Sequence, residues 1–290
     1  MASGCTAGLD TGFVALGYGK VAFLGIIQGL TELMPISSTA HMRIVPALLG
    51  WQDPGSAFSA AMQLAALAAV VAYFWKDIST IGSGAIRAAA RREFGTWDFR
   101  FVVWIVLATI PIAIAGLLLS SRLNACGSSL RGIAVIGIAC IVMGALLAIA
   151  EIYCQHRRVL AGMTLFDALV VGIAQVGALI PGVSRSGSTL TAALFLDLKR
   201  EEAARFSFLL GLPAITLAGL KELYELHKVH LDGHGWSVLA VGLVIGSVAA
   251  FAAIALLMRI LERFSAWPFV VYRIVLGVVL LAGAATGWLA

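Results

Sequence analysis

Charged side chains are scarce in this chain of 290 residues. Asp, Glu, Lys and Arg make up 12% of the sequence, whereas 61% is hydrophobic and the mean hydropathy is +0.99. A soluble domain of this length needs a much larger charged surface, so the scarcity excludes that class and predicts an integral membrane protein. The net charge of +5 is ordinary for cytoplasmic loops rich in Lys and Arg, and it gives no reason to expect nucleic acid as a partner.

Other features are missing as well. The four cysteines lack CxxC spacing, so neither a metal site nor a disulfide framework follows from them. The N-terminus lacks the basic region and cleavage pattern of a secretory signal, so we expect the first hydrophobic segment to be retained. Because no polar stretch is long enough for a second domain, residues 1–290 are predicted to form a single membrane domain.

Several long apolar stretches are present instead. A membrane-spanning helix needs about 20 apolar residues. Six stretches meet this length: residues 58–75, 101–120, 131–150, 206–224, 236–257 and 268–289. The chain is therefore predicted to be all-α, with about six transmembrane helices.

Two further apolar segments, Val21–Leu49 and Leu165–Leu196, are each broken near the centre by proline and by clustered polar side chains. Neither half of either segment is expected to span the membrane alone, since residues 21–34 would form about 21 Å of helix before Pro35 ends it. Non-helical backbone at membrane depth is tolerated where protein or water surrounds it. Each segment is therefore predicted to form a re-entrant helical hairpin.

The two broken segments resemble each other. Residues 25–37 read GIIQGLTELMPIS, and residues 172–184 read GIAQVGALIPGVS. If the connections rich in Lys and Arg are cytoplasmic, the first hairpin enters from outside and the second from inside. We therefore predict inverted repeats over about residues 14–151 and 164–290, with their polar turns meeting near the midplane.

Glu32 marks a functional site, because an ionisable group within an apolar segment is costly unless it is paired or hydrated. The alternative is a carboxylate near a helix end that reaches water. Gln28 lies one turn earlier on the same helix face, where its amide can orient Glu32 or bind the same ligand.

Residues 35–41, PISSTAH, place three hydroxyl groups and an imidazole in one turn: Ser37, Ser38, Thr39 and His41. Hydroxyls donate hydrogen bonds to phosphate oxygens, and histidine can act as base, acid or nucleophile near neutral pH. For the serines, satisfaction of backbone groups at a helix end is an equally open interpretation.

Residues 181–189, PGVSRSGST, give the sharpest prediction. Arg185 combines a bidentate clamp for oxyanions with backbone N–H groups at the start of a helix. The hydroxyls around it are Ser184, Ser186 and Thr189. Together they predict a phosphate cradle, although an arginine that reaches the membrane surface beside a proline kink is the alternative. Arg43 and Arg273 are weaker candidates, since each lies near a plausible interface and can serve as an ordinary anchor.

QGLTELMPISSTAH (residues 28–41) and PGVSRSGST (residues 181–189) closely resemble the two signature motifs of the bacitracin-resistance type of undecaprenyl-diphosphate phosphatase. The resemblance extends over nearly the whole chain. It implies an inner-membrane hydrolase of a phosphoric anhydride bond, which converts undecaprenyl diphosphate to the monophosphate and inorganic phosphate. Such an enzyme recycles the carrier lipid for peptidoglycan synthesis and confers bacitracin resistance.

The resemblance also implies a divalent cation. We hypothesise that the ion is Mg²⁺ or Ca²⁺ and that Glu32 helps to bind it, since both ions prefer oxygen ligands. The implied functional positions are Glu32, Ser38, His41, Ser184, Arg185, Ser186 and Thr189. Two positions depart from the family pattern, since Gln28 stands where many relatives have Glu and Ala40 where glycine is commoner. A scheme with two carboxylates on the metal is therefore in doubt here.

These observations give a hypothesis for the site. The expected catalytic residues are Glu32, Ser38, His41 and Arg185, and the expected phosphate-binding residues are Gln28, Ser37, Thr39, Ser184, Arg185, Ser186 and Thr189. Whether Ser38 or His41 attacks the phosphorus, or instead activates a water, is left open. The expected partners are undecaprenyl diphosphate and membrane lipid, with room for a homodimer, and the site is expected to face the periplasm or exterior. The main alternative is a transporter of lipid or ions, because inverted repeats with broken helices are also a transporter arrangement.

Overall fold

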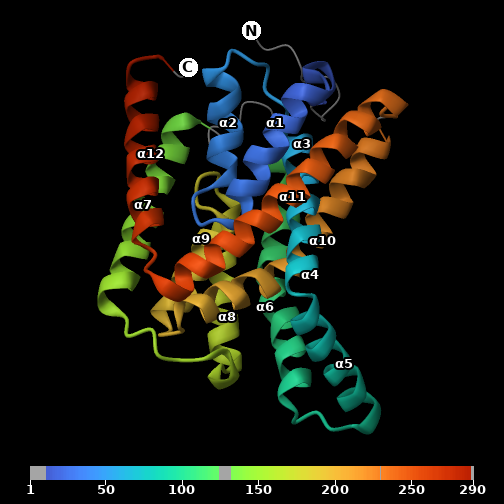
Figure 1. Ribbon diagram of the computed structural model, residues 1–290, viewed down its shortest axis with the longest axis vertical. Helices are drawn as coiled ribbons and strands as arrows, with labels where there is room; N and C mark the ends of the chain where they lie inside the picture. Colours follow the sequence, from blue (N-terminus) through green and yellow to red (C-terminus); the bar gives the residue numbers. More distant parts are fainter. Residues whose placement is uncertain (1–10, 124–131, 229, 289–290) are drawn as a thin grey trace.

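The computed structural model describes residues 11–123, 132–228 and 230–288, apart from the side chains of residue 56 and residues 120–123 (Figure 1). The regular structure in these ranges is helical, as predicted. The helices are α1 (Phe13–Leu33), α2 (Ser38–Leu48), α3 (Ser56–Ala61), α4 (Gln63–Tyr73), α5 (Trp75–Arg91), α6 (Trp97–Leu123), α7 (Ile133–Tyr153), η2 (Leu160–Gly162), α8 (Leu165–Val176), η3 (Gly177–Leu179), α9 (Arg185–Phe195), α10 (Arg200–Lys228), α11 (Gly233–Arg263) and α12 (Trp267–Ala285).

Six of the described helices are long and apolar enough to cross a membrane: α1, α6, α7, α10, α11 and α12. The last five confirm predicted spans, although residues 131 and 289 lie outside the described ranges. The remaining predicted span, residues 58–75, is interrupted at Met62 between α3 and α4, and it bends by 78° into α5.

Helix α1 is longer than the sequence predicted. It has 21 residues and begins at Phe13, and it continues through Gly17, whose φ of 71° lies in the left-handed region that glycine tolerates. The expectation that neither half of the first broken segment can span the membrane is therefore wrong for α1. The second segment is short, as expected, because α8 and η3 end at Leu179 and α9 has 11 residues. The re-entrant insertion of the hairpins stays a prediction.

Hydrogen bonds fix the start of α8. Thr164 and Asp167 form a capping box, in which each side chain accepts a hydrogen bond from the other residue's backbone N–H. Arg158, in the preceding connection, donates to both carboxylate oxygens of Asp167, at 2.6 and 3.0 Å. The hydrogen bond to Asp167 raises the pKa of Arg158, so the ion pair between these two residues at the start of α8 stays charged.

One helix of each hairpin packs closely, through a glycine, against a helix from the other half of the chain. Helix α1 packs along α11, and α8 packs along α6 (Figure 1). A methyl group at Gly25 would lie 2.8 Å from the carbonyl oxygen of Gly242, and one at Gly172 would overlap the carbonyl of Ala108. Small residues permit such close approach of helices in membranes. Gly25 and Gly172 occupy the same place in the repeated sequence, so this reciprocal packing is what interlocked repeats would produce; the inverted orientation and the repeat bounds stay predictions.

Large parts of the outer surface of the molecule are apolar. Leu117, Val248 and Phe166 are 72%, 69% and 69% exposed, whereas polar groups such as Glu32 and Arg273 are buried. This inversion of the usual pattern is expected where lipid replaces water as the solvent. The chain is therefore a multi-pass membrane protein whose polar groups converge inside it.

Candidate active site

Two helical hairpins bring their turns together at the centre of the molecule. One turn joins α1 to α2, and the other joins η3 to α9 (Figure 1). Ser37 and Ser184 are the N-caps of α2 and α9, with φ of 72° and 69°, and their hydroxyls accept hydrogen bonds from the backbone N–H groups of Ala40 and Gly187. A left-handed conformation is unfavourable for serine, so the same unusual cap at both turns indicates a common local construction.

Ser186 connects the two turns directly. Its hydroxyl lies 3.0 Å from the carbonyl oxygen of Met34 and 3.3 Å from that of Glu32, and it donates a hydrogen bond to this pair of acceptors. Next to it, Arg185 Nη2 lies 3.5 Å from Glu32 Oε1. The acid from the first hairpin and the guanidinium from the second therefore face each other, as the sequence predicted.

Arg273 on α12 donates hydrogen bonds to backbone carbonyls of both turns, and we call this set of contacts the brace. Its Nη1 donates to the carbonyl of Pro35 at 3.0 Å, and its Nη2 donates to Gly182 and Val183 at 2.9 and 3.0 Å. The side chain is 1% exposed. The interpretation of Arg273 as an interface anchor is therefore wrong, because its guanidinium is buried against backbone carbonyls that lie on both turns.

Glu32 is the centre of a small polar network. Its Oε2 accepts hydrogen bonds from Ser38 Oγ at 2.6 Å and from Gln28 Nε2 at 2.8 Å. Gln28 Oε1 and Arg185 Nη1 are buried without a hydrogen-bond partner in the described residues. A buried polar atom without a partner is uncommon in proteins, so these two atoms are candidates for contact with a ligand.

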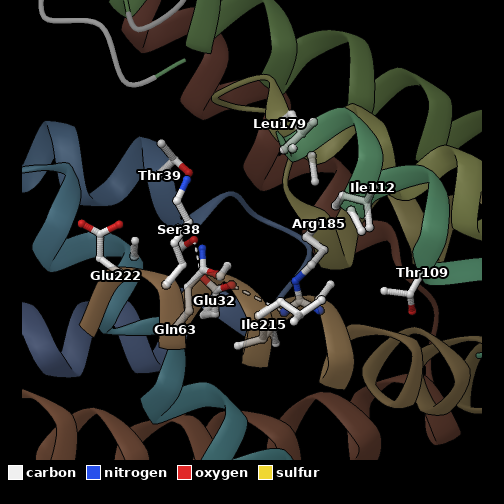
Figure 2. A pocket seen from close by; sticks show the side chains of 18 of the residues that line it. Glu32, Ser38, Thr39, Gln63, Thr109, Ile112, Leu179, Arg185, Ile215 and Glu222 are labelled. Carbon is white, nitrogen blue, oxygen red and sulfur yellow. Dashed lines mark hydrogen bonds and ion pairs between the residues drawn. The ribbon is translucent and has the colours of Figure 1, made fainter. Parts of the chain in front are cut away.

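A cavity of about 620 Å³ opens beside this network (Figure 2). Its polar lining residues are Glu32, Ser38, Thr39, Gln63, Thr109, Ser184, Arg185, Lys221 and Glu222. Its apolar lining comes mainly from α6, η3 and α10, and includes Ile112, Ala113, Leu117, Leu179, Ile215 and Leu217. Leu117 and Leu217 are also exposed on the outer surface, so the apolar wall is continuous with the face that contacts lipid. The cavity can therefore hold a polar headgroup and an apolar chain together.

The first turns of two helices face the cavity. Ser38 and Thr39 begin α2, and Arg185 begins α9 after its cap Ser184; all four line the cavity. The first N–H groups of a helix lack intrahelical partners, and the helix dipole makes that end positive. Two such ends and one guanidinium create a site that favours an anion such as phosphate.

The predicted site residues fall into three groups. Those lining the cavity are Glu32, Ser38, Thr39, Ser184 and Arg185. Those that support the lining from behind are Gln28, Ser37, Ser186 and Thr189, of which Thr189 is fully buried and contacts the hydroxyl of Ser207. His41 is not among the cavity-lining residues, and its catalytic role stays a prediction.

The His41 side chain makes its hydrogen bonds outside the cavity lining. Its Nδ1 lies 2.8 Å from the carbonyl oxygen of Ser37, and its Nε2 lies 2.5 Å from the hydroxyl of Tyr272 on α12. The imidazole therefore links the start of α2 to α12, beside the brace that Arg273 forms. In this arrangement His41 positions the turn that carries Ser38.

Sequence reasoning did not identify Gln63, Thr109, Lys221 and Glu222 as residues of the site. These four residues come from three helices that fold against the hairpins, and no motif connects them. For Arg273 a usable signal existed, since an ionisable residue inside the apolar stretch 268–289 is a functional candidate by the same argument as Glu32.

The residues around Glu32 offer few protein ligands for a metal ion. In the described residues no group of three or more His, Cys, Asp or Glu side chains could hold a metal ion. A cation at this cavity would depend on Glu32, on the unpartnered oxygen of Gln28, and on oxygens of the ligand itself. Hard cations such as Mg²⁺ and Ca²⁺ accept this donor type, and Mg²⁺ is commonly held by one or two carboxylates plus phosphate.

The chain is similar in sequence to known proteins over most of its length. Residues 21–279 match the family model described as bacitracin resistance protein BacA. Undecaprenyl-diphosphatase 2 of Mesorhizobium japonicum is 71% identical over 264 residues, which cover 91% of this chain and 100% of that relative. Undecaprenyl-diphosphatase of Synechococcus elongatus is 50% identical over 267 residues, covering 92% and 93%. That of Gloeobacter violaceus is 48% identical over 274 residues, covering 94% of each chain.

The brace at Arg273 can be tested by substitution. Arg273→Gln and Arg273→Lys each lose the planar fork that reaches both turns, and a buried carbonyl left without a donor costs about 1–3 kcal/mol. We expect kcat to fall about tenfold or more in folded Arg273→Lys protein, with a smaller change in KM, because the turns lose their register.

Arg43→Gln is the matched control, since Arg43 pairs with Asp53 on the exposed surface. It should retain wild-type kcat and thermal stability. Wild-type turnover in Arg273→Gln would show that the brace has no part in positioning the site.

Proposed function

This chain belongs to the bacitracin resistance protein BacA family, and we propose that it removes the terminal phosphate of undecaprenyl diphosphate in the cavity between its hairpin turns. The activity is that of a hydrolase acting on a diphosphate bond, and it returns the carrier lipid to peptidoglycan synthesis. The observation that carries the assignment is the contact between Glu32 and Arg185, two ionisable groups from separate hairpins at one cavity.

The cavity suits both parts of this lipid. The diphosphate lies against Arg185, Ser184 and the first turn of α2, where the guanidinium and two helix N-termini favour negative charge. Arg185 Nη1, which has no partner among the described residues, donates to a phosphate oxygen. The polyprenyl chain leaves along the apolar wall of α6 and α10, towards Leu117 and Leu217.

Charge balance calls for a divalent cation. Among the described residues, the cations that line the cavity are Arg185 and Lys221, and Arg185 is already paired with Glu32, so these groups do not neutralise an incoming diphosphate. Glu32 and the unpartnered oxygen of Gln28 are the groups that would hold Mg²⁺ or Ca²⁺. When bound, such an ion neutralises phosphate charge and polarises the bond that breaks.

Ser38 is the group best placed to attack. Its hydroxyl lines the cavity and already donates to Glu32 Oε2 at 2.6 Å. We assign Glu32 the role of accepting the Ser38 proton as Oγ bonds to the terminal phosphorus. The bond from that phosphorus to the bridging oxygen breaks, and undecaprenyl phosphate leaves. Water then cleaves the phosphoserine, which gives inorganic phosphate and restores the hydroxyl.

The distribution of charge supports one orientation in the membrane. Lys199, Arg200 and Arg205 lie at the start of α10, whereas the cavity-lining Lys221 and Glu222 lie near its other end. Connections rich in Lys and Arg stay cytoplasmic. We therefore place the protein in the inner membrane, with the cavity opening towards the periplasm or cell exterior. The homodimer stays a prediction.

The activity is tested by phosphate release from undecaprenyl diphosphate with purified protein in detergent. Glu32→Gln removes the proton acceptor, and Arg185→Ala removes the phosphate clamp. Each should lower kcat/KM by roughly 10²–10³-fold or more, the range seen when one preorganised electrostatic group is lost. Glu225→Gln and Arg43→Gln, which change exposed ion pairs outside the cavity, should stay close to wild type. A wild-type protein without phosphate release would contradict the assignment and would favour a transporter.

The attacking group is tested by rapid quenching of wild-type protein during turnover. Ser38 should carry a phosphate that chases into inorganic phosphate, and Ser38→Ala should show neither the adduct nor rapid turnover. An adduct on His41 would assign the attack to the imidazole. Turnover with no protein-bound phosphate at any time would instead indicate direct attack by water.

A further inference from the structure

The cavity extends well beyond the groups that carry the reaction. Lys221 and Glu222 on α10 line the same space as Glu32 and Arg185. The guanidinium of Arg185 lies against Gly211 of α10, because a methyl group at that glycine would overlap it. Lys221 comes ten residues after Gly211, which is about 15 Å along a helix. Lys221 therefore lies towards the end of the cavity away from the Arg185 guanidinium.

Lys221 has an available charge. Among the described residues it forms no ion pair, although it lines a cavity that contains two carboxylates. Lys228 on the same helix differs, since it pairs with Glu225 at 3.4 Å and lies 4.3 Å from the centre of the Tyr224 ring. Glu222 follows Lys221 directly, and successive helix residues point about 100° apart, so the two side chains do not face each other.

Uncharged polar side chains also line the cavity. Thr39 and Gln63 line the cavity together with Arg185 and Lys221, and Figure 2 shows Gln63 and Ser38 on the same side as Glu222 and away from Thr109. A phosphate ion cannot leave across the apolar wall, because transfer of a charged group into lipid is costly. A route along polar lining residues is therefore less costly for the product phosphate than one across the apolar wall, which suits the lipid product.

We propose that Lys221 forms an outer anion position, which holds inorganic phosphate after it leaves Arg185 and before it reaches water. The inference rests on the proposed phosphatase activity. A lipid headgroup offers the same phosphate chemistry, and the effect of Lys221 variants on the KM for the lipid distinguishes that source from free phosphate.

The test is product inhibition by added inorganic phosphate during hydrolysis of undecaprenyl diphosphate. The inhibition constant should rise roughly three- to fivefold in Lys221→Gln, as expected for one partly exposed charge, and further in Lys221→Glu. The rise should shrink at high ionic strength, because salt screens exposed charges. Lys228→Gln removes the same charge from the same helix outside the cavity, and it should leave the inhibition constant at the wild-type value.

Two results would overturn the proposal. The first is an inhibition constant that stays at the wild-type value in both Lys221 variants. The second is an unchanged inhibition constant with a raised KM for the lipid, which would assign Lys221 to the headgroup instead. Phosphorus NMR line broadening of inorganic phosphate, measured without lipid, reports the same position without turnover. If wild-type protein fails to hydrolyse the lipid yet broadens the phosphate signal through Lys221, the activity is wrong and the anion position stands.

Discussion

The contact between the Glu32 carboxylate and the Arg185 guanidinium is the constraint on which the rest of the site depends. Both groups lie inside a membrane protein, where an unpaired charge is strongly unfavourable. At 3.5 Å the contact is long, and Arg185 Nη1 has no partner among the described residues. The pair is therefore close enough to keep both charges in place, and open enough to leave the guanidinium available for a phosphate.

Backbone groups of both turns hold this pair in register. The hydroxyl of Ser186 donates to the first turn, and Arg273 donates to carbonyls of both turns. Matching serine caps at Ser37 and Ser184 then direct the positive ends of α2 and α9 at one cavity. The groups that contact substrate are thus few, and most of the polar residues around them serve to position two turns that would otherwise separate.

The sequence contained enough to predict the hairpins and their meeting. Pro35 and Pro181 interrupt apolar segments with the same Gly and Gln spacing, and the charges of Glu32 and Arg185 require a partner inside the membrane. The length of α1 was not predictable in the same way, because the helix continues through Gly17 in a conformation that only local packing selects. The re-entrant insertion depends on the membrane itself and stays a prediction.

Individual side chains were harder to place. His41 follows Ser38 by three residues in α2, but it turns towards Tyr272 while Ser38 lines the cavity, because tertiary packing decides which helix face meets the site. The partners of Arg273 are backbone carbonyls at least 90 residues away in the chain. Every residue has such a carbonyl, so the sequence does not indicate which of them accept a hydrogen bond. Gln63 and Lys221 lie in the cavity because α4 and α10 pack beside the hairpins, a fact of topology that no local motif encodes.

The most direct test of the central claim is a double-mutant cycle on kcat/KM with Glu32→Asp and Arg185→Lys, which keep both charges and leave measurable turnover. If the two side chains act as one unit across the meeting turns, the double variant should be less impaired than the product of the single losses, with a coupling of about 1 kcal/mol or more. Losses that multiply without coupling would mean that the two groups act independently, and they would contradict the account.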